Sequence, residues 1–409
     1  MTPTRRWTIV VLLSLGMIIA YIDRANLSVA LAADDFKQFF RLSDQDRGVL
    51  NSAFFWSYAL LQIPAGFVVD RFGVKIPYAL GFLFWSLTST ATAVATAVWQ
   101  LHLLRLLLGV GEAVVTPASL RWLRFNVEEH QRGLAVGIYM AGTKYGPAIG
   151  TPLAGFLTEM YGWRMMFAIL GLGCLVWLIP WLTLVKNDDR ELEAAALKKS
   201  TSAPVSFGRI FSTRLIWGII TGTFCYNYFV YFCLTWMPSY LKESRGLSLS
   251  GSSLYTGFSF GGMATVAILA GLLADRLIAR GGDAVKVRKA FTIAGLSAAS
   301  SVIGGAFLED NRLALALAIC SLSGLGLATA NYWALTQTLM PGAAIGRIAG
   351  VQNCASNLSG IVAAIFTGWL KQTTGSYAAP ILAVGILLIV GVCAYIFLVD
   401  PKYAPQAKA

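Results

Sequence analysis

Five ionisable residues lie inside stretches of the chain that are otherwise apolar. Asp23 and Arg24 are adjacent in one stretch, Arg105 and Glu112 share a second, and Lys144 lies in a third. A charge at the centre of a membrane helix costs about 2.5 to 3.5 kcal/mol on insertion scales, so such residues normally face a watery cavity and mark a functional site. We therefore take these five residues as the candidate site.

Two acids and three bases suggest a definite chemistry. Burial disfavours a charged carboxyl and a nearby guanidinium favours it, so Asp23 and Glu112 could bind and release protons as a cavity closes and opens. Arginine keeps its charge and offers a planar fork to a carboxylate, which suits Arg24 and Arg105 to an anionic ligand. Protonation of both acids would leave the site strongly positive and favour an anion. By reciprocity, the anion would then strengthen proton binding.

The same residues could instead be packing pairs, Asp23 with Arg105 and Glu112 with Arg24 or Lys144. Buried ion pairs are weak evidence for stability and are costly to maintain, so we favour the functional interpretation. A separation of seven residues places Arg105 and Glu112 on one helix face, whereas Asp23 and Arg24 differ by about 100° around their helix.

The composition indicates that membrane helices position these residues. The chain has 409 residues, of which 56% are hydrophobic and 13% charged, whereas soluble domains have roughly 25% charged residues. A bilayer span needs roughly 20 mostly apolar residues. We expect an all-α membrane protein with twelve transmembrane helices, which begin near Trp7, Val49, Pro77, Trp99, Gly133, Trp163, Arg209, Ser252, Ala290, Leu313, Gly346 and Tyr377.

Lysine and arginine predict the orientation. Most of the 32 basic residues fall on segments that are cytoplasmic if both termini are inside, as the positive-inside rule requires for an even number of spans. The net charge of +12 then reflects topology and attraction to the lipid surface. Nucleic acid is not needed as a partner to explain it.

A repeated motif predicts two pseudo-symmetric six-helix bundles. A polar segment at 186–207 reads as a cytoplasmic linker between an N-terminal bundle, 1–185, and a C-terminal bundle, 208–409. Two homologous bundles in one chain are a transporter plan. The spacing G-x-x-x-D-R follows the second helix of each half, at Gly66, Asp70 and Arg71 and again at Gly271, Asp275 and Arg276.

Neutral polar and aromatic residues predict the character of the ligand. The shortlist in the second half is Tyr228, Asn353 and Asn357, with Tyr58 and Gln62 in the first half. Donors and acceptors beside aromatic rings suit a polyhydroxylated ligand, because each hydroxyl needs a partner once it is dehydrated. The alternative is hydrogen bonding between helices, worth roughly 0.6 kcal/mol for each bond.

Glycines spaced by four residues predict a close helix contact. Gly142, Gly146 and Gly150 form a small-xxx-small seam. Lys144 is about 200° around the helix from its neighbouring glycines, so it points away from the seam. It could contact the substrate or act as an ion-pair partner.

The chain resembles the major facilitator superfamily. Gly66, Asp70, Arg71, Gly73 and Lys75 look like the loop signature of that superfamily between helices 2 and 3, with a weaker echo between helices 8 and 9. Within it, the chain is similar to the anion:cation symporter family, which includes bacterial galactonate and hexuronate permeases and animal sialic-acid and vesicular glutamate transporters. The matching stretches are YIDRANLSVA, FFWSYALLQIPAGFVVDRFG, RLLLGVGEAVVTPA and TWMPSYL.

The resemblance implies roles for individual residues. In bacterial members the acids of helices 1 and 4 are proton sites, which correspond to Asp23 and Glu112. The helix 1 arginine, here Arg24, contributes to substrate recognition. The loop signature helps to hold the outward-open state, so its residues and their repeats are candidates for conformational gating. Lys144 departs from the family pattern and leaves the substrate less defined.

We therefore expect a proton-coupled symporter that imports a monocarboxylate sugar acid, an aldonate or hexuronate, by alternating access. It would be a monomer in the bacterial inner membrane, driven by the proton gradient. The alternatives are an organic-anion exchanger or efflux antiporter, an importer of an aromatic carboxylate such as phthalate, and a transport-like membrane sensor. No P-loop, zinc spacing or nucleophile constellation suggests an enzyme, and the six cysteines lack paired spacing, so we expect no metal or other cofactor.

Overall fold

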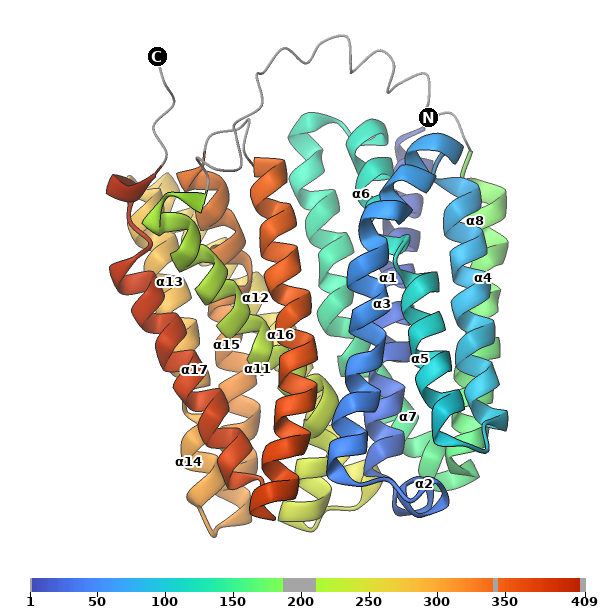
Figure 1. Ribbon diagram of the computed structural model, residues 1–409. Helices are drawn as coiled ribbons and strands as arrows, with labels where there is room; N and C mark the ends of the chain where they lie inside the picture. Colours follow the sequence, from blue (N-terminus) through green and yellow to red (C-terminus); the bar gives the residue numbers. More distant parts are fainter. Residues whose placement is uncertain (1, 187–210, 341–344, 405–409) are drawn as a thin grey trace. The chain divides into compact units, whose positions relative to one another are not determined.

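The computed structural model describes residues 2–186, 211–340 and 345–404, and these ranges contain helices and no strand (Figure 1). Contacts divide the chain into two units, Met1–Thr201 with Leu241–Gly257, and Ser202–Tyr240 with Phe258–Ala409. The predicted linker, 186–207, lies outside the described residues except for Lys186. Its boundaries stay a prediction.

The first unit is built around two long helices that pack side by side, α1 and α7. A short helix, α2, lies at the opposite end of this unit from the N-terminus (Figure 1). The α-helices are α1 (Pro3–Ala32), α2 (Asp34–Phe40), α3 (Asp44–Phe72), α4 (Lys75–Ala91), α5 (Val98–Glu112), α6 (Val115–Asn126), α7 (Glu129–Gly173) and α8 (Leu178–Leu184). Two 3₁₀ turns, η1 (Thr92–Val94) and η2 (Cys174–Trp177), follow α4 and α7.

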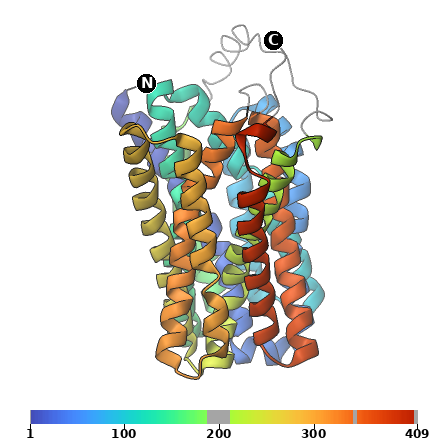
Figure 2. The ribbon, with the colours of Figure 1, turned by 90° about the vertical axis from the view of Figure 1, so that its left-hand side faces the viewer.

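Most of the remaining helices belong to the second unit, where they run nearly parallel to one another (Figure 2). Helices α13 and α15 form an extensive contact, and α17 packs on α13. The helices after the linker are α11 (Arg214–Arg245), α12 (Leu249–Ala279), α13 (Ala284–Ala299), α14 (Val302–Phe307), α15 (Asn311–Leu339), α16 (Ile345–Thr374) and α17 (Ala378–Phe397). The last residues of α11 and the start of α12 are grouped with the first unit.

The expected twelve-helix membrane fold is confirmed. Nine helical stretches in the described ranges have the length and composition of a membrane span. One of them, Glu129–Leu184, has 56 residues and suffices for two crossings; it bends at Gly162, where a φ of 79° favours glycine. The remaining two predicted spans are α4, which continues into η1, and α13, which is followed by α14.

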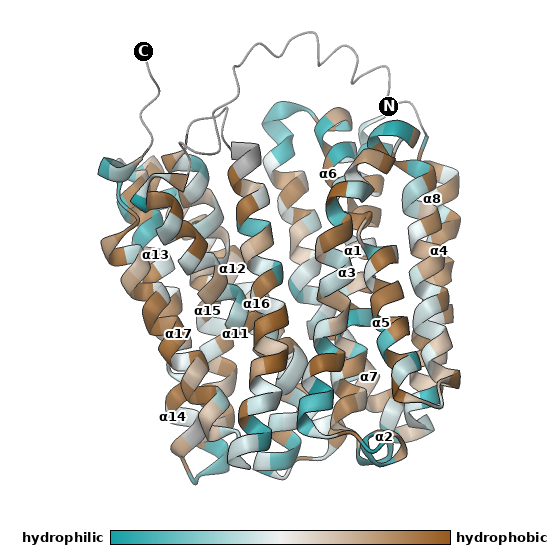
Figure 3. Ribbon diagram, viewed as in Figure 1, coloured by the Kyte–Doolittle hydropathy of each residue, from teal (hydrophilic) through white to brown (hydrophobic). Residues whose placement is uncertain are grey.

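The outer faces of the helices are apolar, as contact with lipid requires. Brown, hydrophobic residues follow the helices along their length, whereas teal residues gather toward the helix ends (Figure 3). On α3, for example, Leu60, Ile63 and Phe67 are each at least 70% exposed. Such side chains fit a bilayer, whose interior offers no hydrogen-bond partners and is filled by hydrocarbon.

The glycine seam of α7 sets the distance to α1. A Cβ atom added at any of the three glycines would collide with α1, at Met17 for Gly142, at Tyr21 for Gly146 and at Ile22 for Gly150. The seam therefore allows the two backbones to approach closely, as small residues do between membrane helices. This contact lies on the segment of α1 that leads into Asp23 and Arg24.

Candidate functional site

Four of the five predicted ionisable residues meet inside the first unit. Asp23 and Arg24 come from α1, and Arg105 and Glu112 come from α5. Both acids are fully buried, and the two arginines are 7% and 6% exposed. Lys144 lies on α7 and is partly buried, and its predicted role stays a prediction.

Arg24 and Glu112 form a direct ion pair, with 2.7 Å between Arg24 Nε and Glu112 Oε2. Glu112 Oε1 is buried and has no hydrogen-bond partner among the described residues. Three rings surround the guanidinium, with centroids at 4.4, 4.6 and 4.5 Å for Tyr21, Phe54 and Tyr58. Aromatic faces attract a cation, so these three rings help to hold the guanidinium of Arg24 in place.

Asp23 has a different environment. Its Oδ1 accepts hydrogen bonds from Ser89 Oγ at 2.7 Å and from Asn26 Nδ2 at 3.2 Å. Within the described ranges its buried Oδ2 has no partner. Arg105 donates to the backbone oxygen of Asp23 at 3.3 Å and to Asn26 Oδ1 at 3.2 Å. The predicted alternative pair of Asp23 with Arg105 is therefore indirect, whereas the pair of Glu112 with Arg24 is observed.

Ser89 and Asn26 were not predicted as site residues. Asn26 follows Asp23 by three residues, a spacing that places two side chains on one helix face, so the motif YIDRANLSVA carried a usable signal. Ser89 carried none, because serine in a helix commonly bonds to its own backbone. Only the tertiary structure, which brings Ser89 of α4 next to Asp23 of α1, reveals the bond between them.

The two neutral residues of the first unit that were predicted to contact the ligand, Tyr58 and Gln62, lie on α3. Tyr58 is buried, stacks on Phe54 at a centroid distance of 5.2 Å and lies 3.4 Å from the hydroxyl of Thr116. Gln62, one turn further along α3, is partly buried. Since Tyr58 also covers Arg24, an aromatic ring and a guanidinium are adjacent here.

The shortlisted residues of the second unit lie on α11 and α16. Tyr228 is 1% exposed, and its hydroxyl lies near the side chain of Thr367. Asn357 is buried and Asn353 is partly buried. Their predicted ligand contacts stay predictions.

Other polar residues of the second unit make the bonds between helices that the alternative interpretation describes. Gln352 Nε2 donates to the hydroxyls of Thr223 and Thr336, each at 3.1 Å. Tyr226 and Thr329 place their hydroxyls 2.8 Å apart. These contacts join α11, α15 and α16.

Each acid of the repeated motif pairs with a base of its own unit. Asp70 accepts from Arg121 of α6 at 2.6 Å, and Asp275 accepts from Arg288 of α13 at 3.1 Å. Arg71 lies over the ring of Phe72. The predicted gating role of Gly66, Asp70 and Arg71, and of Asp275 and Arg276, stays a prediction, and the two basic partners were not foreseen.

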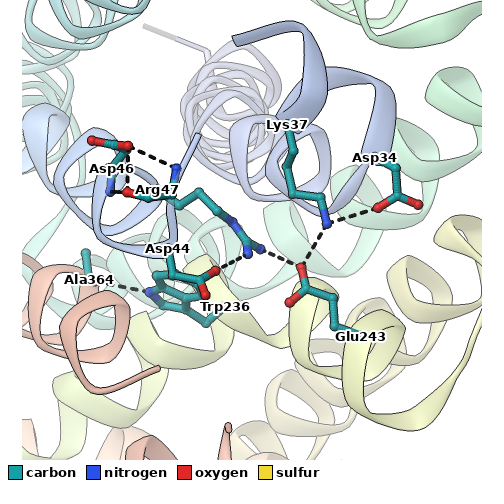
Figure 4. A network of polar contacts seen from close by, with 9 residues as sticks. Asp34, Lys37, Asp44, Asp46, Arg47, Trp236, Glu243 and Ala364 are labelled. Carbon is teal, nitrogen blue, oxygen red and sulfur yellow. Dashed lines mark hydrogen bonds and ion pairs between the residues drawn. The ribbon is translucent and has the colours of Figure 1, made fainter. Parts of the chain in front are cut away.

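A second polar network of the first unit surrounds Glu243 (Figure 4). Glu243 accepts from Arg47 at 3.0 Å and from Lys37 at 3.1 Å. Arg47, which is 2% exposed, also binds Asp44 at 2.7 Å. Asp34 binds Lys37 and Lys242, and these two ammonium groups lower the pKa of Asp34. The network joins α2, α3 and the last turn of α11.

Comparisons with known proteins identify the family to which the chain belongs. A family model described as the Major Facilitator Superfamily matches residues 13–364. A D-galactonate transporter of Escherichia coli O6:H1 is 30% identical, with 97% of this chain and 96% of that protein covered. The protein of Cupriavidus necator named "Probable sulfoacetate transporter SauU" is 32% identical over 93% of this chain and 90% of its own. A hexuronate transporter of Bacillus subtilis is 29% identical, with 96% and 94% covered.

Among solved structures, a bacterial homologue of the human lysosomal transporter Spinster, in an inward-facing and occupied conformation, has a TM-score of 0.82. It covers 100% of both chains at 16% identity, which supports the fold alone. The family model, the relatives and the helical membrane fold lead to one conclusion. The chain belongs to the major facilitator superfamily, among transporters like those of the anion:cation symporter family, and is a multi-pass membrane transporter and not an enzyme.

Proposed function

We propose that this transporter is a proton-coupled symporter that imports a monocarboxylate sugar acid, an aldonate or hexuronate such as galactonate. It would work as a monomer in the bacterial inner membrane with both termini in the cytoplasm, and the proton gradient would drive it without a metal or other cofactor. The observation that carries the proposal is the buried pair of Arg24 and Glu112, in which one carboxylate oxygen remains without a partner.

Coupling follows from the charge of this pair. While Glu112 is ionised, it neutralises Arg24 at 2.7 Å, and an incoming carboxylate meets a second negative charge. Protonation of Glu112 removes that charge, so the guanidinium can pair with the carboxylate of the substrate instead. A substrate that prefers the protonated site must in turn increase the affinity for the proton, by a coupling free energy that is typically about 1 to 3 kcal/mol.

Asp23 is the proposed second proton carrier. Its buried Oδ2 is available for a proton, while Oδ1 is held by Ser89 and Asn26. Arg105 contributes positive charge next to it. Two protons carried with one monoanion would move net positive charge, and each charge crossing 100 mV supplies about 2.3 kcal/mol. Such a carrier would concentrate its substrate.

The ligand would be recognised by neutral and aromatic side chains as well as by charge. Tyr58, Gln62 and Lys144 are the proposed contacts on the first unit, and Tyr228, Asn353 and Asn357 those on the second. Hydroxyl and amide groups suit the hydroxyls of a sugar acid, because each must regain a hydrogen bond after losing water. The names of the galactonate and hexuronate transporters support this substrate class.

Three rivals share the same fold and differ in the flux that they predict. An exchanger or efflux antiporter would move the anion without a proton-driven accumulation. A phthalate-like acid would stack on the tyrosine rings. The relative named as a probable sulfoacetate transporter suggests the third rival, an importer of a small sulfonate. The charge of the sulfonate would also pair with Arg24.

The test is uptake by purified protein in proteoliposomes, with and without an inward proton gradient. The panel is galactonate, gluconate, glucuronate, galacturonate, phthalate, sulfoacetate and glutamate. We expect one sugar acid to accumulate only when the gradient is present. Uptake that ignores the gradient would contradict symport and favour the exchanger, and accumulation of phthalate or sulfoacetate alone would contradict the sugar-acid assignment.

A further inference from the structure

The carboxyl of Asp23 is held asymmetrically. Oδ1 receives both hydrogen bonds, from Ser89 Oγ at 2.7 Å and Asn26 Nδ2 at 3.2 Å, and all three residues are buried. Oδ2 is also buried, and the described residues offer it no hydrogen-bond partner. One oxygen of the carboxyl therefore accepts hydrogen bonds, whereas the other can carry a proton.

Asn26 is the link between this acid and the nearest base. Its Oδ1 accepts from Arg105 Nη2 at 3.2 Å, while its Nδ2 donates to Asp23. A guanidinium can only donate, so the amide oxygen must face Arg105 and the amide NH₂ must face Asp23. The orientation of the amide is thus fixed by chemistry, and Asn26 is a neutral spacer between the carboxylate and the guanidinium.

We propose that Ser89 and Asn26 are positioning residues that set the proton affinity of Asp23 and direct its proton to Oδ2. The inference rests on the proposed function, in which Asp23 carries a proton. Hydrogen bonds donated to a carboxylate stabilise its charged form, so the two donors oppose the effect of burial and allow the proton to leave. A direct ion pair with Arg105 would stabilise the charged form further and hinder protonation. Asn26 prevents this ion pair, because it lies between the two groups.

Several other groups surround Asp23 and would remain in place in the variants. Arg105 and Glu112 approach from α5, and Arg24 is the next residue of α1. The thiol of Cys174 approaches from η2. From α4, the indole of Trp85 lies close enough to offer the carboxyl of Asp23 a further hydrogen bond, weaker than those of Ser89 and Asn26. Since Ser89 and Asn26 are neutral, replacing them changes hydrogen bonding to Asp23 without changing the charge of the site.

The experiment is the pH dependence of galactonate uptake into proteoliposomes, or of whichever panel substrate the protein accumulates. Ser89→Ala removes the shorter of the two bonds, so Asp23 should bind its proton more readily. We expect the pH of half-maximal uptake to rise by about one unit, the size of one hydrogen bond to a charged group. Asn26→Leu removes the second donor but keeps a side chain of similar volume between Asp23 and Arg105, so it should shift the midpoint in the same direction. The apparent KM measured at a pH below both midpoints should stay unchanged.

Two variants serve as controls. Ser86→Ala alters a serine of the same helix that is equally buried and whose Oγ has no partner in the described structure, so the midpoint should stay at the wild-type value. Ser89→Thr keeps a hydroxyl at the position and should restore a midpoint near that of the wild type. If Ser89→Ala does not fold, Asn26→Leu still removes one of the two donors to Asp23 and tests the inference.

The outcomes separate this inference from the proposed function. A wild-type profile that depends on pH but is unchanged by Ser89→Ala and Asn26→Leu overturns the inference and leaves proton coupling intact. An equal shift in Ser86→Ala also overturns it, because the effect would then be a general response of α4. Wild-type uptake that does not depend on pH at all overturns the proposed function, and this inference with it.

Discussion

Arg24 Nε lies 2.7 Å from Glu112 Oε2 in the interior of the first unit, and both side chains are shielded from solvent. An ion pair at this depth is costly, because both groups lose their hydration. Replacing one partner should therefore change both transport and stability. Transport assays and thermal melting measure these two effects separately.

Glu112→Gln should abolish accumulation driven by a proton gradient while exchange of substrate across the membrane persists. Glutamine imitates the protonated acid and cannot release a proton, so position 112 no longer couples the affinity for the anion to the proton gradient. Accumulation and counterflow in proteoliposomes measure the two activities. The control is Glu129→Gln, which removes an exposed acid at the start of α7 and should leave both unchanged.

Asp23→Asn should also abolish proton-driven accumulation. The amide keeps the shape of the carboxyl and can still accept a bond from Ser89, but it carries no titratable proton. Asp35→Asn on α2, an exposed position, is the matched control. Normal concentrative uptake by Asp23→Asn would exclude this residue as a proton carrier.

Arg24→Ala should weaken substrate binding at least tenfold, which is about 1.4 kcal/mol. Arg24→Lys should recover little of the loss, because an ammonium lacks the planar fork and packs less well among three rings. Binding can be measured by the thermal shift of the purified protein at a series of substrate concentrations. An unchanged affinity in Arg24→Ala would remove this residue from the recognition site.

The same pair predicts a pattern of stability. Arg24→Ala leaves a buried carboxylate without its counter-ion, and the loss of one partner of a buried pair costs about 3 to 5 kcal/mol. Adding Glu112→Gln to Arg24→Ala should recover part of that loss. Thermal melting in detergent at neutral pH checks this, and a double variant less stable than Arg24→Ala would argue against the pair as described.

The Asp34 contacts predict a pH-dependent contribution to stability. Lys242 and Lys37 lower the pKa of Asp34 in the folded protein, so its stabilising effect is present above the unfolded pKa, about 3.9, and is lost as the pH falls through the lower folded value. The side chain is 61% exposed, so we expect less than about 1 kcal/mol. The melting temperatures of wild type and Asp34→Asn should differ at pH 6 and converge once the pH falls below the lowered pKa of Asp34.

Much of the fold followed from the sequence, because apolar runs and charge asymmetry carry strong signals in membrane proteins. The candidate acids were found in the same way, since Asp23 and Glu112 interrupt apolar helices. The observed pair of Arg24 with Glu112 was one of the alternatives, and only packing could select it. The bonds of Asp70 to Arg121 and of Asp275 to Arg288 were not foreseen, because the partner of a long charged side chain depends on tertiary geometry.

Neutral partners were the hardest to foresee. Ser89 is separated from Asp23 by 66 residues, and its type and spacing resemble those of many serines in the chain. Gly142, Gly146 and Gly150 were recognised by their periodicity, but the sequence did not reveal that they face α1. Periodic patterns identify a helix face, whereas the identity of the neighbour depends on the assembled bundle.

The most direct test of proton coupling is to record proton and substrate movement together in one vesicle preparation. Galactonate, or the sugar acid that the panel identifies, is added outside proteoliposomes that contain a pH-sensitive dye inside and have no initial gradient. For the wild type we predict acidification of the lumen that accompanies uptake, and for Glu112→Gln, in vesicles preloaded with the same sugar acid, we predict counterflow without acidification. Substrate entry into wild-type vesicles with no acidification, or equal acidification by Glu112→Gln, would contradict the coupling by Arg24 and Glu112.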